Sequence, residues 1–429
     1  MTGGATPISG SVATMSIPLR LTVMNFMQFF VWGAWLISFG AYMSKALGFT
    51  GLQIGSIYGT MGVASLFMPG VMGIVADRWL NAERLYGILH LTGAALILWA
   101  STVHDYETLY FIMLLNACVY MPTIALNNTI SFRVLEQQGM NFIQKFPPIR
   151  VWGTVGFIIA MWFTDLSGST LTTGQLYISA GAATFLGLYG FTMPACPPSR
   201  GEGKRSLAEA LGLDALVLFK RVQMVVFFLC AMMLGGALQI TNAFGGDFLT
   251  DFNAVYPDSF GVRHPILLSS ISQISETLFI LTIPLFLQRF GIKVVMITAI
   301  FAWVLRFGLF AYGDPGPGLW MLVLSMIVYG MAFDFFNISG AMYVNLEANS
   351  RIRASAQGLF MVMTNGLGAF LGTMVAGAVV DHYTVGGVRD WHSIWIAFAS
   401  YALVLGILFP FVFRYRHDPA RMAAAATAH

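Results

Sequence analysis

Long apolar segments alternate with short polar ones along almost the whole chain. Each apolar segment reaches the ~20 residues that an α-helix needs to cross the hydrocarbon core of a bilayer. The pattern predicts twelve of them, at about residues 20–46, 51–76, 84–103, 107–132, 148–166, 173–194, 222–249, 266–288, 292–312, 318–346, 353–382 and 391–414. We therefore expect an all-α polytopic membrane protein with twelve transmembrane helices.

The longest interruption lies in the middle of the chain and predicts the domain organisation. Six segments precede it and six follow it, so residues 19–194 and 222–415 are each expected to form a six-helix bundle. The interruption, residues 195–221, begins with the polar run CPPSRGEGKR and continues with LAEALGLDALVLF, which is long enough for a short helix. Residues 1–18, rich in Gly, Ser and Thr, are expected to form a disordered leader, and residues 416–429 a tail.

Composition agrees with this class of protein and argues against others. The chain is 57% hydrophobic and only 10% charged, whereas soluble domains are about a quarter charged. The net charge of +3 is small and no basic run is interleaved with aromatic residues, so nucleic-acid binding is not expected. The Cys and His residues show no metal-ligand spacing and there is no Gly-x-x-x-x-Gly-Lys loop, so neither a metal nor a cofactor is expected.

The positions of the basic residues predict the orientation. Of the 22 Lys and Arg residues, all but Lys45, Arg263, Arg306 and Arg389 fall on the side that holds both termini. Acidic residues dominate the opposite side. By the positive-inside rule, both termini and the central linker are expected to be cytoplasmic. Arg306, in the outer part of the ninth segment, is expected to extend toward the surface or to pair with an outer acid.

Two acids lie near the middle of apolar segments, where a charge is costly. Glu276 is in the eighth segment and Asp334 in the tenth. Each has an amide three residues away on the same helix face, Gln273 and Asn337 respectively. Acids at that depth usually face a water-filled cavity and mark a substrate or proton path. The alternative is a structural network in which the acids are neutral hydrogen-bond donors.

Pairs of amides occur at corresponding places in the two halves. Asn25 and Gln28 lie in the first segment, and Gln239 and Asn242 in the seventh. Amides both donate and accept hydrogen bonds, which suits contact with a polar substrate. The alternative is hydrogen bonding between helices, which is common for these residues in membranes.

The loops that follow the second and eighth segments also correspond. Gly73-Ile-Val-Ala-Asp77-Arg78 matches the opening of the loop signature of the major facilitator superfamily, although Leu80 and Asn81 depart from its continuation. The second loop, Gln288-Arg289-Phe-Gly291-Ile-Lys293, retains the part that the first one lacks. Parallel six-helix repeats with a site at the midplane are the architecture of that superfamily.

Five motifs make a resemblance more specific. They are Phe146-Pro147-Pro148-Ile149-Arg150, Leu238-Gln239-Ile-Thr-Asn242, Ser272-Gln273-Ile-Ser-Glu276-Thr-Leu-Phe, Phe333-Asp334-Phe-Phe-Asn337-Ile-Ser-Gly and Arg353-Ala-Ser-Ala-Gln357-Gly. With them the chain resembles the bacterial nucleoside:proton symporter family, over about residues 16–415. The resemblance implies the major facilitator fold of two pseudo-symmetric six-helix bundles. It also implies proton-driven nucleoside uptake across the cytoplasmic (inner) membrane by alternating access.

The resemblance favours substrate contact for the residues in and around these motifs. Thr154 and Phe157 follow Arg150 on the same helix face, and aromatic rings beside Asp334 can stack on a base. The expected substrate site is Arg150, Thr154, Phe157, Gln239, Asn242, Gln273, Glu276, Tyr329, Phe333, Asp334 and Asn337. Asp334 and Glu276 are also expected to carry the proton. Asp247 stands where an uncharged residue is expected, and is interpreted as an exposed helix end or as a change to the outer vestibule.

The expected partners are a nucleoside, protons and the lipid bilayer, and the protein is expected to be monomeric. The nearest alternative is a proton-coupled sugar or oligosaccharide permease of the same fold. An intramembrane enzyme is a further alternative, but the chain has no His-Glu-x-x-His, no Gly-x-Ser-x-Gly and no paired-Asp motif.

Overall fold

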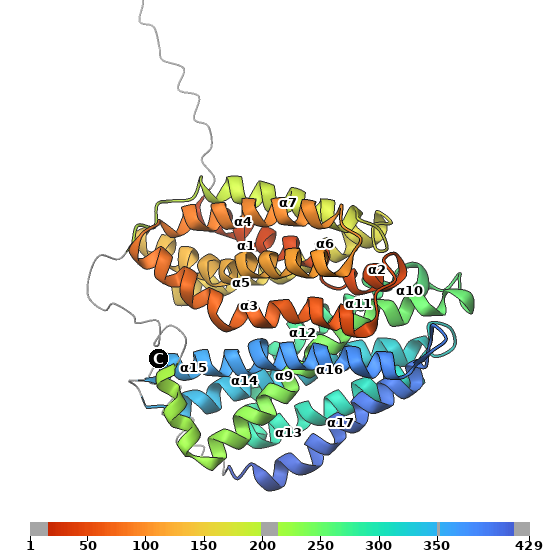
Figure 1. The fold of residues 1–429 in the computed structure, drawn as a ribbon. Helices are drawn as coiled ribbons and strands as arrows, with labels where there is room; N and C mark the ends of the chain where they lie inside the picture. Colours follow the sequence, from red (N-terminus) through yellow and green to blue (C-terminus); the bar gives the residue numbers. More distant parts are fainter. Residues whose placement is uncertain (1–15, 199–212, 350–351, 416–429) are drawn as a thin grey trace, which may run out of the picture.

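The computed structural model describes residues 16–198, 213–349 and 352–415. The chain forms two bundles of long, roughly parallel helices that lie side by side (Figure 1). The predicted tail, most of the predicted leader and most of the linker lie outside the described residues. The first helix already includes Ile17 and Pro18, so the end of the predicted leader is helical. Proline is well suited to the first turn because its missing N–H has no intrahelical partner there.

The first bundle is built from the N-terminal half. It contains α1 (Ile17–Gly33), α2 (Phe39–Lys45), α3 (Gly51–Arg78), α4 (Ala82–Ala100), α5 (Tyr106–Gln137), α6 (Phe142–Leu166) and α7 (Gly174–Gly190). The first predicted segment is therefore broken at residues 34–38, between α1 and α2. Tyr58 of α3 stabilises the non-helical backbone at this break, since its hydroxyl donates to the Leu36 carbonyl at 2.5 Å and accepts from the Gly40 amide at 3.0 Å.

The second bundle follows the linker. It contains η1 (Leu213–Lys220), α9 (Val222–Asp251), η2 (Phe252–Ala254), α10 (Phe260–Arg263), α11 (Pro265–Ser269), α12 (Ile271–Ile280), α13 (Ile283–Tyr312), α14 (Leu319–Glu347), α15 (Arg353–Met361), η4 (Val362–Gly368), α16 (Ala369–His382), β1 (Thr384–Val385), β2 (Val388–Arg389) and α17 (Trp391–Val412). The eighth predicted segment turns into the ninth at Gly291, which has a φ of 75° that glycine adopts without steric cost. η4 is a π-helical turn between α15 and α16.

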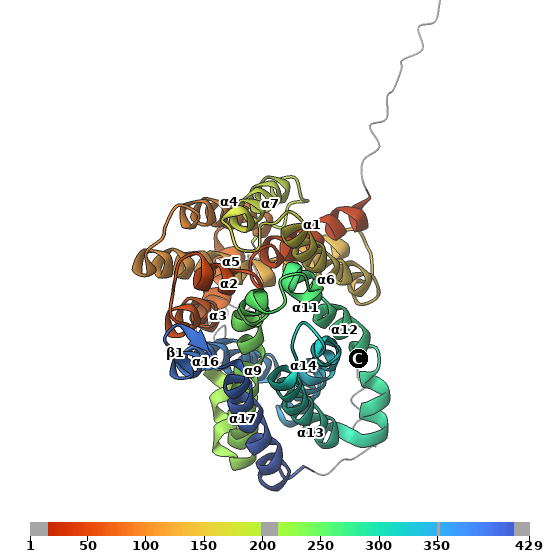
Figure 2. The same cartoon turned by 90° about the vertical axis from the view of Figure 1, so that its right-hand side faces the viewer.

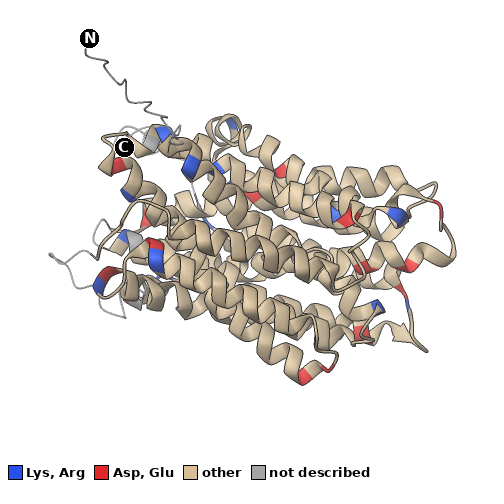
Figure 3. Cartoon of the chain, turned by 90° about the horizontal axis from the view of Figure 1, so that it is seen from above, with Lys and Arg blue, Asp and Glu red and all other residues tan. Residues whose placement is uncertain are grey.

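The helices are those of a membrane protein. Eight of them, among the described residues, are long and apolar enough to cross a bilayer. The other four predicted segments correspond to α1 with α2, α4, α7, and α11 with α12, which are shorter, interrupted or less apolar. Charged residues lie mainly at the two ends of the bundles, and the long middle carries few (Figure 3). Twelve spans in two six-helix bundles are thus confirmed.

Close packing of glycines joins the two halves along α3 and α16. A methyl group on Gly55 would meet the Thr373 carbonyl oxygen at 2.1 Å, and one on Gly51 would meet that of Gly377 at 2.6 Å. The backbones of the two helices therefore touch directly, as small residues allow in membranes. The four-residue recurrence of Gly51, Gly55 and Gly59 has this packing role.

The end of the molecule that carries α2, α10 and the β1–β2 hairpin is here called the hairpin end, and it faces the viewer in Figure 2. Charged residues join the two halves at this end. Lys45 of α2 forms ion pairs with Asp247 and Asp251 of α9. Arg389 of β2 lies 2.7 Å from the other oxygen of Asp247. Asp247 is fully buried between these cations, so its interpretation as an exposed helix end is wrong. A carboxylate can be buried here because two cations compensate its charge.

A second group of contacts crosses between the halves at the same end. The carboxylate of Asp165, at the end of α6, lies 2.7 Å from Nδ1 of His264 and accepts from the Ile266 amide at 3.2 Å. Asp381 of α16 accepts from the amides of Gly51 and Leu52 at 2.6 and 2.8 Å, which places a carboxylate at the N-terminus of α3. The hairpin end is therefore closed by polar contacts drawn from both bundles.

Candidate functional site

The two membrane-embedded acids lie next to each other on α12 and α14. Gly330 allows this, because a methyl group there would meet the Ser275 carbonyl oxygen at 2.6 Å and the Glu276 nitrogen at 2.8 Å. Glu276 and Asp334 are close enough to repel each other electrostatically. Asp334 is only 4% exposed, and its Oδ2 has no hydrogen-bond partner among the described residues. Such an arrangement disfavours two simultaneous negative charges and so favours binding of a proton.

A cation from the other bundle faces the acid on α12. Arg150 of α6 places its guanidinium carbon 4.2 Å from the centre of the Phe29 ring, and it attracts Glu276 electrostatically. One turn further along α6, Thr154 is half-buried. Phe157 is buried and packs edge-on against Trp32, with the ring centres 6.2 Å apart. Of the α6 residues expected in the site, Arg150 thus faces the second bundle, whereas Phe157 packs within the first.

The expected amides of the second bundle remain available for further hydrogen bonds. Asn242 donates to Gln239 at 3.3 Å, which is a contact within α9. Both side chains are half-buried. Asn242 and Gln273 line one cavity together with Ile37, Met161, Thr241, Gly245, Ser269, Ser272, Arg306, Phe310, Met326 and Tyr329. The lining comes from both bundles, so the cavity lies at their interface.

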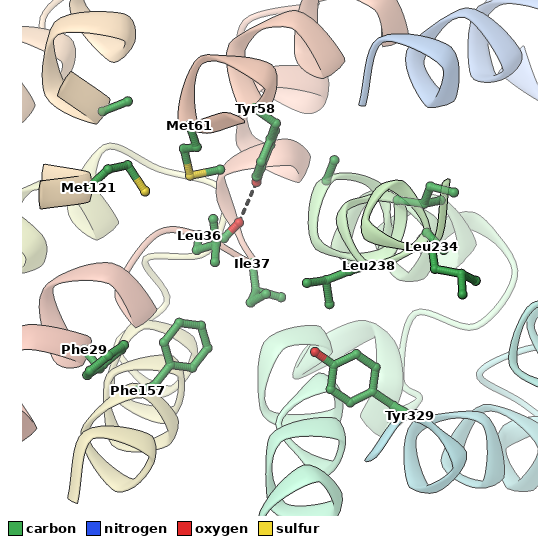
Figure 4. Close-up of a cluster of buried hydrophobic side chains, with 14 of the residues drawn as sticks. Phe29, Leu36, Ile37, Tyr58, Met61, Met121, Phe157, Leu234, Leu238 and Tyr329 are labelled. Carbon is green, nitrogen blue, oxygen red and sulfur yellow. Dashed lines mark hydrogen bonds between the residues drawn. The ribbon is translucent and has the colours of Figure 1, made fainter. Parts of the chain in front are cut away.

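Aromatic side chains of both bundles meet in the same region. Tyr329 stacks on Phe333 with the rings 5.9 Å apart and nearly parallel. Tyr329 also interacts with Gln273 and Glu276. Figure 4 shows its hydroxyl pointing toward the region where Ile37 and Phe157 of the first bundle and Leu238 of α9 converge.

The structure places Asn337 at the margin of the site. Its amide donates to the Phe333 carbonyl of its own helix at 3.1 Å. Asn337 and Phe333 line a separate cavity between α9, α14 and the π turn η4. Although Asn337 shares a helix face with Asp334, its amide does not line the cavity that contains Asn242 and Gln273.

Arg306 does not behave as its position in the sequence suggests. It is 3% exposed, so it does not extend to the surface, and among the described residues it forms no ion pair. Its guanidinium lies over the Tyr329 ring at 4.6 Å and donates to the Ser325 carbonyl at 2.8 Å. The expectation of snorkelling or pairing is therefore wrong, because the neighbouring helices enclose the side chain on all sides. Its position as a lone Arg inside an apolar run was the sequence signal for a buried side chain.

The arrangement is suited to binding a polar molecule and a proton. It combines amides, aromatic faces, a cation and two adjacent acids at the interface of the bundles. Among the described residues, no group of three His, Cys, Asp or Glu side chains has the arrangement of a metal site.

Comparison with known proteins gives consistent relatives over nearly the whole chain. The family model described as "Nucleoside H+ symporter" matches residues 15–418. The xanthosine permease of Escherichia coli is 53% identical over 97% of this chain and its own full length. The nucleoside permease NupG of the same organism is 50% identical with the same coverage. A maltose permease of Geobacillus stearothermophilus is only 22% identical, so the sugar permease alternative is not supported.

Solved structures agree with these relatives. Crystal structures of the nucleoside transporter NupG and of a mutant of it match with TM-scores of 0.90 and 0.91 at 50% identity. They cover 94% and 93% of this chain and the whole of each matched chain. The fold is the twelve-helix major facilitator fold, and the protein is a multi-pass protein of the bacterial inner membrane. The chain therefore belongs to the nucleoside H+ symporter family and is a transporter, not an enzyme.

Proposed function

We propose that this transporter binds its nucleoside and its proton at the interface between the bundles, in the cavity and beside the adjacent acids. The observation that carries the proposal is the meeting of Arg150, from one bundle, with Glu276 and its neighbour Asp334, from the other. A ligand held at this interface contacts both moving bodies, which is what alternating access requires. Binding can then be coupled to the relative position of the bundles.

The polar and aromatic residues divide the recognition between them. Gln239, Asn242 and Gln273 offer donors and acceptors to the base edge and the ribose hydroxyls. Tyr329, Phe333 and Phe157 offer rings for stacking on the base, an interaction of about 1–3 kcal/mol per base in nucleic-acid binders. Arg150 and Thr154 complete the site from α6. Asn337 supports Phe333 from the neighbouring turn.

The proton is carried by Asp334, with Glu276 as its partner. Glu276 has Arg150 as a compensating cation, whereas Asp334 has none among the described residues and one unpartnered oxygen. Protonation of Asp334 removes its repulsion with Glu276, so these two acids add no uncompensated charge when the bundles move with nucleoside and proton bound.

Uptake driven by a pH gradient in proteoliposomes tests this proposal. Asp334→Asn and Glu276→Gln keep the side-chain shape but cannot titrate, so we expect at least one of them to abolish accumulation against a gradient. Binding measured on the same preparations should survive Asp334→Asn, since the neutral form accompanies the substrate. The matched control is Asp258→Asn, which removes an exposed carboxylate and should accumulate substrate normally. Normal accumulation by both buried variants would show that these acids do not carry the proton.

We also propose that the hairpin end faces outward and that the protein works as a monomer within the lipid bilayer. The clustering of basic residues on the side of the termini supports this orientation. With the hairpin end closed by contacts from Asp165, Asp247 and Asp381, the described arrangement is then inward-facing. Reporter fusions at His429 and within residues 201–205 should read cytoplasmic, and one near Pro257 external. A cytoplasmic signal near Pro257 would reverse the orientation.

A further inference from the structure

Arg306 is a buried cation without a compensating anion. Burying an unpaired charge is costly, and a guanidinium in a membrane protein normally finds a carboxylate. Here Nη1 donates to the Ser325 carbonyl at 2.8 Å and reaches the Ser272 hydroxyl at 3.5 Å, while Nε has no partner among the described residues. The rings of Tyr329, Phe310 and Trp303 surround it at 4.6–5.9 Å. Cation–π contacts offset only part of this cost.

The side chains around Arg306 are arranged to donate hydrogen bonds into the cavity. The Ser272 oxygen lies opposite the guanidinium and its hydroxyl donates to no described acceptor, so its hydrogen is free for a ligand. The Tyr329 hydroxyl points toward the middle of the site (Figure 4). No described Asp or Glu lines this cavity, although Glu276 borders it through its interaction with Tyr329. The charge of Glu276 is compensated by Arg150 rather than by Arg306. A cation with a neighbouring hydroxyl and no carboxylate of its own is a site for an anion or for a strongly polarised carbonyl oxygen.

This cavity forms part of the proposed nucleoside site, because Asn242, Gln273 and Tyr329 line it and are also expected to hold the nucleoside. A nucleoside held by the two amides therefore extends an edge of its base toward Arg306. Among nucleosides, a buried cation distinguishes those whose base is acidic and bears two carbonyl groups. Such a base loses a proton near neutral pH and then carries its negative charge on the carbonyl oxygens.

We propose that Arg306, Ser272 and Tyr329 form a subsite for the anionic, dioxo edge of an acidic nucleobase. The inference rests on the proposed function, because it assigns a specificity to the same site. A neutral base also fits, with one carbonyl oxygen in the subsite, but the cation then remains uncompensated. The consequence is a preference for acidic bases that rises with pH as the base loses its proton. Inorganic chloride is the competing occupant, because it offers the same charge.

Calorimetric binding of xanthosine and inosine to the purified full-length protein tests the proposal. The two nucleosides differ by one carbonyl group on the base, and only xanthosine is acidic near neutral pH. We expect the unaltered protein to prefer xanthosine more strongly at pH 7.5 than at pH 5. In Arg306→Gln the dissociation constant of xanthosine should rise relative to that of inosine by roughly tenfold to a hundredfold, as expected for loss of a charged hydrogen bond.

Two further variants keep the result interpretable. Ser272→Ala removes a single small donor and should shift the same ratio in the same direction by a few-fold, even if Arg306→Gln folds poorly. Lys293→Gln removes a cation from the same helix, far from the cavity, where Lys293 donates to the Pro410 carbonyl. It should leave the ratio at its original value. All measurements are repeated with gluconate replacing chloride.

The outcomes separate the two proposals. If no nucleoside binds the unaltered protein, the proposed function fails. If both nucleosides bind but Arg306→Gln and Ser272→Ala weaken them equally, Arg306 only supports Tyr329 and the subsite is wrong. If binding depends on chloride and shows no preference for xanthosine, the occupant is an inorganic ion and the subsite for a base is again wrong.

Discussion

Two pairs of amide side chains, one in each bundle, have the same spacing along their helices but differ in burial and in hydrogen-bond partners. Asn25 and Gln28 lie on α1, and Gln239 and Asn242 lie on α9, the first helix of the second repeat. The α1 pair is fully buried, whereas the α9 pair is half-buried. Equivalent positions in a repeat therefore do not have equivalent roles.

The α1 pair is satisfied within the first bundle. Gln28 donates to Thr123 at 2.9 Å, and its carbonyl oxygen lies 2.7 Å from the Tyr86 hydroxyl and 3.0 Å from Nε2 of His90. Asn25 bonds to the side chains of Ser131 and Asn127. With these bonds made, the α1 pair has little capacity left for a ligand, and its role is to hold α1, α4 and α5 together.

The α9 pair has no comparable set of partners among the described residues. Its single bond between side chains joins Asn242 to Gln239. Polar groups that are removed from bulk water normally find partners, so the partners of this pair must be water or a ligand. Unused hydrogen-bonding capacity, rather than the presence of amides, therefore distinguishes the proposed binding surface from the structural contact in α1.

The largest effect is expected from Gln28→Leu. The substitution leaves the buried Tyr86 hydroxyl and His90 ring without their partner, and each such group costs about 1–3 kcal/mol. The free energy of unfolding should fall by about 2–6 kcal/mol, as read from thermal unfolding of the purified protein. Gln239→Leu is the matched control, and its unfolding should change by less than about 1 kcal/mol. Equal losses in the two variants would remove the distinction between the pairs.

A smaller loss of stability is expected from Asn25→Ala. It removes the acceptor of the Asn127 amide, which lies 2.7 Å away, so the expected cost is about 1–3 kcal/mol. Nucleoside affinity, corrected for the fraction of folded protein, should remain at its original value. A loss of affinity without a loss of stability would instead place α1 in the binding site.

The α9 pair should show the reverse pattern. Gln239→Ala and Asn242→Ala should each raise the nucleoside dissociation constant roughly tenfold or more, because a polar contact in a desolvated site is lost. Their unfolding should change by no more than about 0.5 kcal/mol. Gln273→Ala is expected to behave in the same way. Unchanged affinity in all three variants, measured by calorimetry, would mean that these amides only join helices.

The smallest effect is expected from Asn337→Ala. Its amide bonds to its own helix at the Phe333 carbonyl, so removal should raise the nucleoside dissociation constant less than about threefold. Calorimetry alongside Asn242→Ala makes the comparison direct. A loss as large as that of Asn242→Ala would bring Asn337 into the main cavity.

Much of this molecule can be predicted from local patterns, because the bilayer constrains each helix separately. Hydropathy and length predict the twelve spans, and an acid in an apolar run predicts an interior position, as Glu276 and Asp334 show. The break at residues 34–38 depends instead on Tyr58, and the burial of Asp247 depends on Lys45 and Arg389. These partners lie far away in the sequence, so no local pattern contains them. The burial of Arg306 is likewise set by distant residues, since neighbouring helices determine whether a cation reaches the surface.

The π turn η4 fixes the residue count of the helix that contains it. A π turn accommodates one extra residue, and each residue of an α-helix turns the chain by about 100°. Beyond η4, Gly372 packs against Gly236 of α9 and Gly377 against Gly51 of α3. Deletion of one residue within Val362–Gly368 would rotate these glycines away from both neighbours. This stretch should therefore tolerate substitutions far better than insertions or deletions, and length variation among natural variants should be confined to the loops.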